Sequence, residues 1–79
     1  MTESKHFQEM LLERQIEREW VDRTLNDPDE LEYRDDRTQH FLKQILEREN
    51  RWLRVIVNVA VDPPKLITAF FDRRLRNQI

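Results

Sequence analysis

The stretch that decides the fold spans residues 51–61 and reads Arg51-Trp52-Leu53-Arg54-Val55-Ile56-Val57-Asn58-Val59-Ala60-Val61. Side chains on a β-strand alternate between its two faces. One face of this stretch is wholly apolar, with Leu53, Val55, Val57, Val59 and Val61, and the other is mixed, with Trp52, Arg54, Ile56, Asn58 and Ala60. Because β-branched residues pack well on a pleated surface, the pattern predicts a central strand with one face in the core.

The segments around this stretch supply its partner strands. Residues 38–46 read as extended, and the polar residues 47–50 join them to the central strand in an antiparallel hairpin. Residues 66–71 follow the turn at 62–65 and supply a last strand beside the central one, while residues 31–34 read as a short further strand. We therefore expect an antiparallel sheet of three or four strands.

Two helices are predicted before the first strand. Ser4 is suited to cap a helix over residues 5–15, in which Phe7, Met10, Leu11 and Arg14 recur at the spacing of one helical face. A second helix is predicted over residues 18–26, because Pro28 disfavours helical geometry just before it. We expect one α+β domain, residues 1–79, with both helices packed on the apolar face of the central strand. The opposite face, which carries Arg54, is expected to be open to water or to a partner.

The composition excludes several classes of protein. With 79 residues, the chain has room for one core. It contains no cysteine and no glycine, which argues against thiolate metal sites, disulfides and glycine-rich phosphate loops. The acidic pairs Asp35-Asp36 and Asp27-x-Asp29 are more typical of turns than of metal sites. We expect no cofactor, no metal, no membrane segment and a cytoplasmic location.

Charge is distributed unevenly along the chain. Residues 1–36 contain five Lys/Arg and twelve Asp/Glu, whereas residues 37–79 contain nine Lys/Arg and four Asp/Glu. The predicted helices are therefore acidic and the predicted sheet basic. A basic sheet suits a phosphate-bearing partner or an acidic protein. The alternative is that the two halves simply neutralise each other across the fold.

Four arginines are candidates for contact with nucleic acid: Arg14, Arg51, Arg73 and Arg74. Guanidinium groups pair bidentately with phosphate, which favours this interpretation. For Arg14 the alternative is a stem packed on the core with its guanidinium at the last helix carbonyls or at an acidic side chain. Arg73 and Arg74 belong to the basic tail over residues 72–79, for which the alternative is a solvated end.

An ordered set of short motifs carries a family resemblance. The set comprises His6-Phe7, Arg14-x-Ile16, Trp20-Val21, Leu25, Pro28-Asp29, the run from Trp52 to Val57 and the run from Leu66 to Phe70. It resembles a family of small bacterial domains of unknown function that is similar to BECR-type ribonucleases, the group named for barnase, EndoU, certain colicins and RelE, and to BrnT-like toxins. The resemblance extends from about His6 to Phe71.

This resemblance implies helices followed by a meandering antiparallel sheet, with an RNA-cleaving site made of His6, Arg54 and Thr68. Histidine suits proton transfer near neutral pH, arginine can clamp the phosphate, and a threonine on the neighbouring strand can hold it in register. Each residue also has a structural alternative: a local bond at the helix start for His6, a cross-strand ion pair for Arg54 and a plain strand position for Thr68. We expect His40 on an exposed strand face.

Two functional hypotheses follow. The first is a toxin-like, metal-independent endoribonuclease, or a degenerate relative, that acts on RNA with its basic sheet and is neutralised by an antitoxin protein. The second is a non-catalytic binding or regulatory module that engages a protein, for instance as a homodimer through Trp52 and Ile56. Whether the protein is an enzyme is left open by the sequence.

Overall fold

The computed structural model describes residues 1–75 and has an α+β fold, as predicted. Two helices, α1 (Lys5–Glu13) and α2 (Arg18–Asn26), come first. Four strands follow, β1 (Glu30–Tyr33), β2 (Thr38–Ile45), β3 (Arg51–Asn58) and β4 (Lys65–Phe71), with a short 3-10 helix, η1 (Leu46–Arg48), between β2 and β3. The tail residues 76–79 lie outside the described part of the chain.

The four strands form one antiparallel meander in the order β1-β2-β3-β4. The predicted hairpin is confirmed, because β2 and β3 pair along their whole length from Thr38↔Asn58 to Ile45↔Arg51. β3 is central, as expected, but it ends at Asn58. Val59 and Val61, predicted on its apolar face, lie beyond the strand and are exposed.

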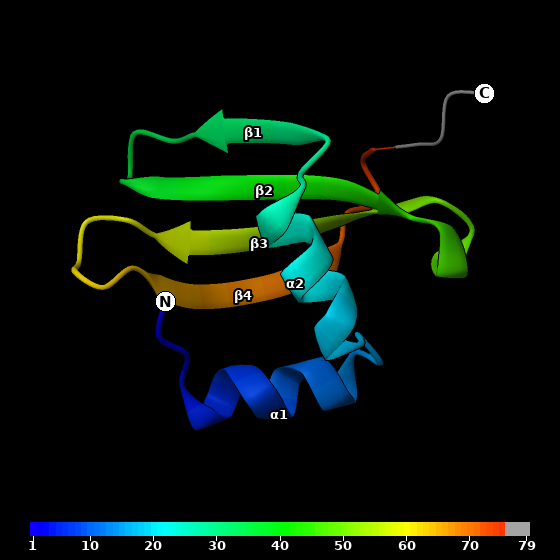
Figure 1. The fold of residues 1–79 in the computed structure, drawn as a ribbon, viewed down its shortest axis with the longest axis horizontal. Helices are drawn as coiled ribbons and strands as arrows, with labels where there is room; N and C mark the ends of the chain where they lie inside the picture. The colour runs from blue at the N-terminus through cyan, green and yellow to red at the C-terminus, as the bar shows by residue number, and fades with distance from the viewer. Residues whose placement is uncertain (76–79) are drawn as a thin grey trace.

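Both helices lie against the apolar face of the sheet. In Figure 1, α2 crosses in front of the sheet and α1 runs along β4. Leu53, Val55 and Val57 of β3 are completely buried there, in one cluster with apolar side chains of α1 and α2. The prediction that the helices use this face as their floor is therefore confirmed for these three residues.

The helix boundaries follow from local chemistry. The Ser4 hydroxyl accepts a hydrogen bond from the Phe7 amide at 3.1 Å, so the predicted N-cap of α1 is confirmed. α1 ends at Glu13, two residues earlier than expected, because Gln15 adopts a positive φ of 55° that turns the chain out of the helix. Ile16 is then buried, close to the start of α2.

The outer edge of β4 is protected by the N-terminal part of the chain. Thr2 pairs with it through Thr2 N to Pro64 O at 2.9 Å and Leu66 N to Thr2 O at 2.8 Å. Further along, Arg14 donates a hydrogen bond to the carbonyl of Ala69 at 2.8 Å. Exposed strand edges invite pairing with other chains, and these contacts satisfy part of this edge.

The central position of Leu53 gives a test of the packing. Leu53→Ala removes a completely buried side chain from the floor of the core and is expected to lower the free energy of unfolding by about 2–5 kcal/mol. The matched control is Leu12→Ala, since Leu12 is 81% exposed and should change stability by no more than about 0.5 kcal/mol. Urea unfolding measures both, and equal losses would contradict this assignment of the core.

Candidate functional site

A hollow of about 300 Å³ lies where the start of β3, the end of β4, η1 and the α1–α2 connection meet. It is lined by Arg14, Ile16, Arg48, Arg51, Phe70, Phe71 and Arg73. We call it the arginine cavity. Four of its seven lining residues are arginines and none is acidic. Three of the four arginines predicted to contact nucleic acid, Arg14, Arg51 and Arg73, therefore share one hollow.

The cavity arginines differ from the other arginines in their charge partners. Within residues 1–75, Arg18, Arg23, Arg34, Arg54 and Arg74 each lie within 4.0 Å of a carboxylate oxygen. None of the four cavity arginines forms such an ion pair in that part of the chain. The positive charge of the hollow is therefore not compensated locally, and a concave surface of one charge sign attracts anions.

Phe71 holds two of these guanidinium groups in place. The Cζ atoms of Arg48 and Arg51 lie 4.9 and 5.4 Å from the centroid of its ring, within the range of a cation–π contact. Arg48 also lies 5.9 Å from the Trp20 ring and donates a hydrogen bond to the carbonyl of Gln15 at 3.1 Å. A guanidinium has five N–H donors, so these contacts leave donors of both arginines available.

Arg14 joins α1 to the sheet. Its Nη1 donates to the Thr68 hydroxyl at 3.1 Å and to the Ala69 carbonyl at 2.8 Å. The expectation that this guanidinium meets the last carbonyls of its own helix or an acidic side chain was wrong. The reason is that α1 runs beside β4, whose edge carbonyl needs a donor, and a helix pattern alone does not reveal that neighbour.

The three residues predicted as a catalytic set are not joined by contacts within residues 1–75. Thr68 bonds to Arg14 and approaches the Met10 sulfur at 3.1 Å. His6 is exposed on α1, and its side chain forms no hydrogen bond or ion pair with the described residues. Arg54 points its guanidinium to other partners, as described next. Their catalytic roles remain a prediction.

Arg54 lies at the centre of a buried ionic cluster on the sheet face away from the helices. Its Nε donates to Asp72 Oδ2 at 2.8 Å, and its Nη1 donates to Glu32 Oε1 at 3.0 Å. The side chain is only 5% exposed, so the expectation that this face presents an open Arg54 was wrong. The alternative, a cross-strand ion pair, is confirmed. A charge this deep is tolerated because carboxylates and hydrogen bonds compensate for its lost hydration.

His40 belongs to the same cluster, and the expectation of an exposed histidine was wrong. Its Nδ1 lies 2.8 Å from Arg54 Nη1, and its Nε2 lies 3.1 Å from the Thr38 hydroxyl. Arginine only donates, so Nδ1 must accept and the imidazole is neutral with its proton on Nε2. The Thr38 hydroxyl then donates to Asp36 Oδ1 at 2.6 Å. His40 can be buried because Arg54 and Thr38 form hydrogen bonds with its two ring nitrogens.

The charges in this cluster shift the pKa of its titratable groups. Hydrogen bonds from Arg74 and then Arg54 hold the pKa of Asp72 well below its usual range. A hydrogen bond from Arg54 lowers the pKa of Glu32. Burial, followed by the positive charges of Arg34 and Arg54, lowers the pKa of His40. All three shifts favour the charge state in which Arg54 is paired.

Arg74 is the predicted nucleic-acid contact that lies outside the arginine cavity. Its Nε and Nη2 donate to Asp72 at 3.0 Å, so its charge is already partnered. The sequence reasoning missed Arg48 and Phe71. Arg48 lies in the polar connection 47–50, whose charged residues were read only as a hairpin tip, and nothing in the pattern indicated that it folds back over Phe71.

Acidic residues do not form a metal site in the described part of the chain. No group of three or more histidines and carboxylates within residues 1–75 is arranged to hold an ion. Asp36 bonds to the Thr38 amide at 3.1 Å, and Asp29 accepts from the Gln44 amide at 3.0 Å. The Asp36 bond is local and fits the turn interpretation, whereas Asp29 reaches an amide of β2 that lies 15 residues away.

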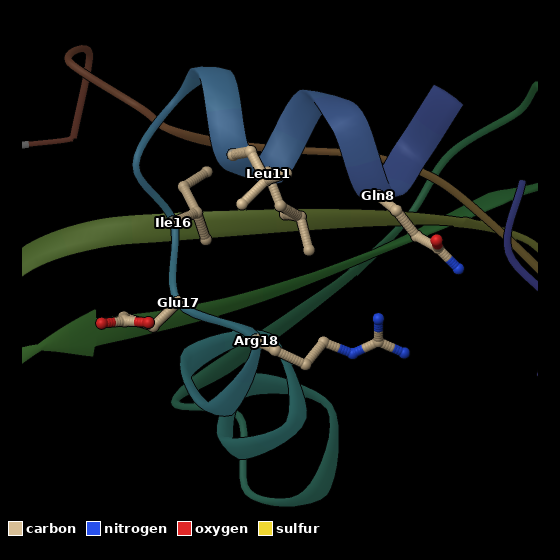
Figure 2. A pocket seen from close by; sticks show the side chains of 6 residues that line it. Gln8, Leu11, Ile16, Glu17 and Arg18 are labelled. Atoms are coloured by element: carbon tan, nitrogen blue, oxygen red, sulfur yellow. The ribbon is translucent and has the colours of Figure 1, made fainter. Parts of the chain in front are cut away.

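A second hollow, of about 390 Å³, lies between α1 and α2. Its lining residues are Gln8, Leu11, Leu12, Ile16, Glu17 and Arg18 (Figure 2). The Arg18 guanidinium is paired with Glu3 and lies near Asp22. This hollow therefore offers apolar surface and an already neutralised cation, and we assign it no chemistry.

The fold and the arginine cavity together define a small α+β domain with a helical pair, a four-stranded antiparallel sheet and a cationic hollow at one end of that sheet. The chain belongs to the DUF4258 family, a domain of unknown function, which matches residues 4–71. No curated protein and no solved structure gives a significant match. The family match carries no link to ribonuclease toxins, so that resemblance stays a prediction.

No helix in residues 1–75 has both the length and the apolar character needed to span a bilayer.

The buried His40 predicts how stability depends on pH. Its pKa is lower in the folded state than in the unfolded chain, so the unfolded state binds more protons below about pH 6.5. Stability is expected to be highest above that pH and to fall as the pH drops from 7 to 5. In His40→Gln this part of the fall should shrink, because the variant lacks the imidazole whose pKa is lowered in the folded state. Urea unfolding at several pH values measures the free energy of unfolding. The same dependence on pH in wild type and His40→Gln would contradict the buried neutral imidazole.

Proposed function

We propose that this domain binds RNA at the arginine cavity, as the phosphate-holding part of a toxin-like endoribonuclease or of a degenerate relative of one. The observation that carries the proposal is the set of four arginines around one hollow, with no ion pair to a carboxylate within residues 1–75. Most arginines elsewhere in that part of the chain are neutralised by acidic side chains. A concave cluster of like charge without a local counter-charge attracts an anionic ligand.

Guanidinium chemistry supports phosphate as the group bound. Arginine presents paired N–H donors that match two phosphate oxygens, and such charge-assisted bonds are stronger than neutral ones. The side chains of Arg51 and Arg73 form no hydrogen bond or ion pair within residues 1–75, so all their guanidinium donors are available. Arg48 is held against Phe71 and Trp20, which reduces the entropy lost on binding.

RNA as the source of the phosphate is supported by the resemblance to BECR-type ribonucleases and by the basic half of the chain. Three of the cavity arginines, Arg48, Arg51 and Arg73, come from residues 37–79, where Lys and Arg outnumber Asp and Glu. An antitoxin with an acidic segment would, on this proposal, cover the same cavity. Trp52 and Ile56 are partly buried on the sheet face that points away from the helices. A homodimer through these two residues stays a separate prediction.

In this proposal, Arg54 no longer has the role of stabilising the phosphate. Metal-independent cleavage needs a base, an acid and cations for the charge that grows on phosphate. Arg54 is unsuited to the last role because Asp72, Glu32 and His40 already occupy its donors. We assign that role to Arg51 and Arg73, and we keep His6 and Thr68 as the candidates for proton transfer and for positioning.

Binding is tested with a single-stranded, 2′-O-methyl RNA, which has no free 2′-hydroxyl to attack the phosphate. Arg51→Ala and Arg73→Ala are each expected to weaken binding by about three- to tenfold. Each should also flatten the dependence of log K on log salt concentration by roughly 0.7, the value for one phosphate contact on a single strand. Fluorescence polarisation at several salt concentrations gives both quantities.

The matched control for these variants is Arg37→Asn. Arg37 is an exposed arginine outside the cavity and forms no ion pair within residues 1–75. Asparagine tolerates its positive φ of 64° better than alanine does. This control should bind RNA as the wild type does. Equal losses in all three variants would indicate a general charge effect and would remove the cavity from the proposal.

Cleavage is tested separately by incubating the purified protein with total RNA in the presence of EDTA. Wild type is expected to degrade RNA, with a drop of at least about 100-fold in rate for His6→Ala if this imidazole transfers a proton. His40→Gln, which removes the other histidine, is the control and should remain active. RNA that is bound but left intact by wild type would exclude the nuclease and leave the degenerate, binding-only relative.

A further inference from the structure

We propose that the arginine cavity takes the terminal phosphate of an RNA chain in preference to a phosphodiester within the chain. This rests on the proposed function and narrows its ligand to a phosphomonoester end. Two features of the hollow support it: its density of uncompensated charge, and the number of chain segments that surround it.

The cavity carries more positive charge than one phosphodiester can neutralise. Four guanidinium groups line one hollow of about 300 Å³ without a lining carboxylate. A phosphodiester brings one negative charge, whereas a phosphomonoester carries about −1.5 to −2 at pH 7 and three strongly accepting oxygens. The additional charge lies at the same short distance from the cations, so its Coulomb attraction adds directly to binding.

The hydrogen-bond donors available in the cavity also favour a phosphomonoester over a phosphodiester. Arg51 and Arg73 have all donors free within residues 1–75, and Arg48 and Arg14 each use Nη1 for a protein carbonyl. Two acceptor oxygens of a diester cannot engage donors from all four groups in bidentate fashion. Three terminal oxygens engage more of them, so a monoester leaves fewer guanidinium donors without a partner.

The surroundings of the cavity favour a chain end. Its walls come from the α1–α2 connection through Arg14 and Ile16, from η1 through Arg48, from β3 through Arg51 and from the end of β4 through Phe71. A phosphate inside an RNA chain must leave its site in two directions. A terminal phosphate needs only one exit, and it can therefore be surrounded on more sides.

The experiment compares three forms of one 2′-O-methyl RNA 12-mer: without a terminal phosphate, with a 5′-phosphate, and with a 3′-phosphate. Each is measured by fluorescence polarisation at pH 7.5 with EDTA, with the dye at the unphosphorylated end or, for the first form, at either end. One phosphorylated form is expected to bind about five- to tenfold more tightly than the hydroxyl form. Arg51→Ala and Arg73→Ala should lose this preference, and Arg37→Asn should keep it.

The outcomes separate the inference from the proposed function. If all three RNAs bind with the same affinity and that affinity falls in Arg51→Ala and Arg73→Ala, the terminal-phosphate inference is overturned while RNA binding at the cavity stands. If none of the RNAs binds, or if binding is unchanged in both variants, the proposed function itself fails.

A nucleoside monophosphate as competitor identifies the source of the phosphate. It shares the phosphomonoester group but lacks the rest of the chain. The inference expects it to displace the phosphorylated RNA only at a concentration at least about tenfold above that of unlabelled phosphorylated RNA, because the remaining nucleotides also contact cations. Equal potency of the two competitors would assign the cavity to a free nucleotide and overturn the RNA end.

Discussion

The structure depends on the two different faces of β3. On one face, Leu53, Val55 and Val57 form the floor on which α1 and α2 pack. On the other, Arg54 would be a severe cost if it stayed unpaired, because a buried charge loses its hydration. Asp72 from the end of β4 and Glu32 from β1 meet this guanidinium. The central strand is therefore fixed by apolar packing on one side and by charge pairing on the other.

Arginines in this chain serve two distinct purposes. Those with carboxylate partners, such as Arg54 and Arg23, connect elements that are distant in sequence; Arg23 of α2 reaches Glu47 of η1 at 2.9 Å. Three of those around the cavity, Arg14, Arg48 and Arg51, are held instead by aromatic rings or by backbone carbonyls. Rings and carbonyls orient a guanidinium without cancelling its charge. This difference keeps a net positive hollow in a protein whose formal charge is −2.

The ionic cluster and the arginine cavity adjoin each other at the end of β4. Asp72 bonds to Arg54 and also accepts from the Arg74 amide at 3.0 Å, so it closes a turn around Arg73. Arg73 lines the cavity, whereas its neighbours on both sides face the buried cluster. The turn over residues 72–75, which the Leu75 amide closes on the Asp72 carbonyl at 3.2 Å, accompanies this division. The chain thus carries its structural and its candidate binding charges on adjacent residues.

Local patterns in the sequence were sufficient for the fold. The alternation over residues 51–58, the Ser4 cap and the spacing of Phe7, Met10 and Leu11 each depend on near neighbours, and the elements they predict are present. The same local reasoning selected Arg14, Arg51 and Arg73, which the fold brings to one cavity. Composition also indicated that the basic charge lies in the second half of the chain.

Only the tertiary structure decided which charges are free and which are paired. Nothing in the sequence shows that Arg54 is neutralised by Asp72, 18 residues away, or that Arg51 lies over the ring of Phe71. The strand pattern predicts an exposed His40 because the guanidinium that bonds to its ring belongs to another strand. Ion pairs and hydrogen bonds between distant residues depend on strand register and on the path of the connections, and neither is encoded in the type of a single residue.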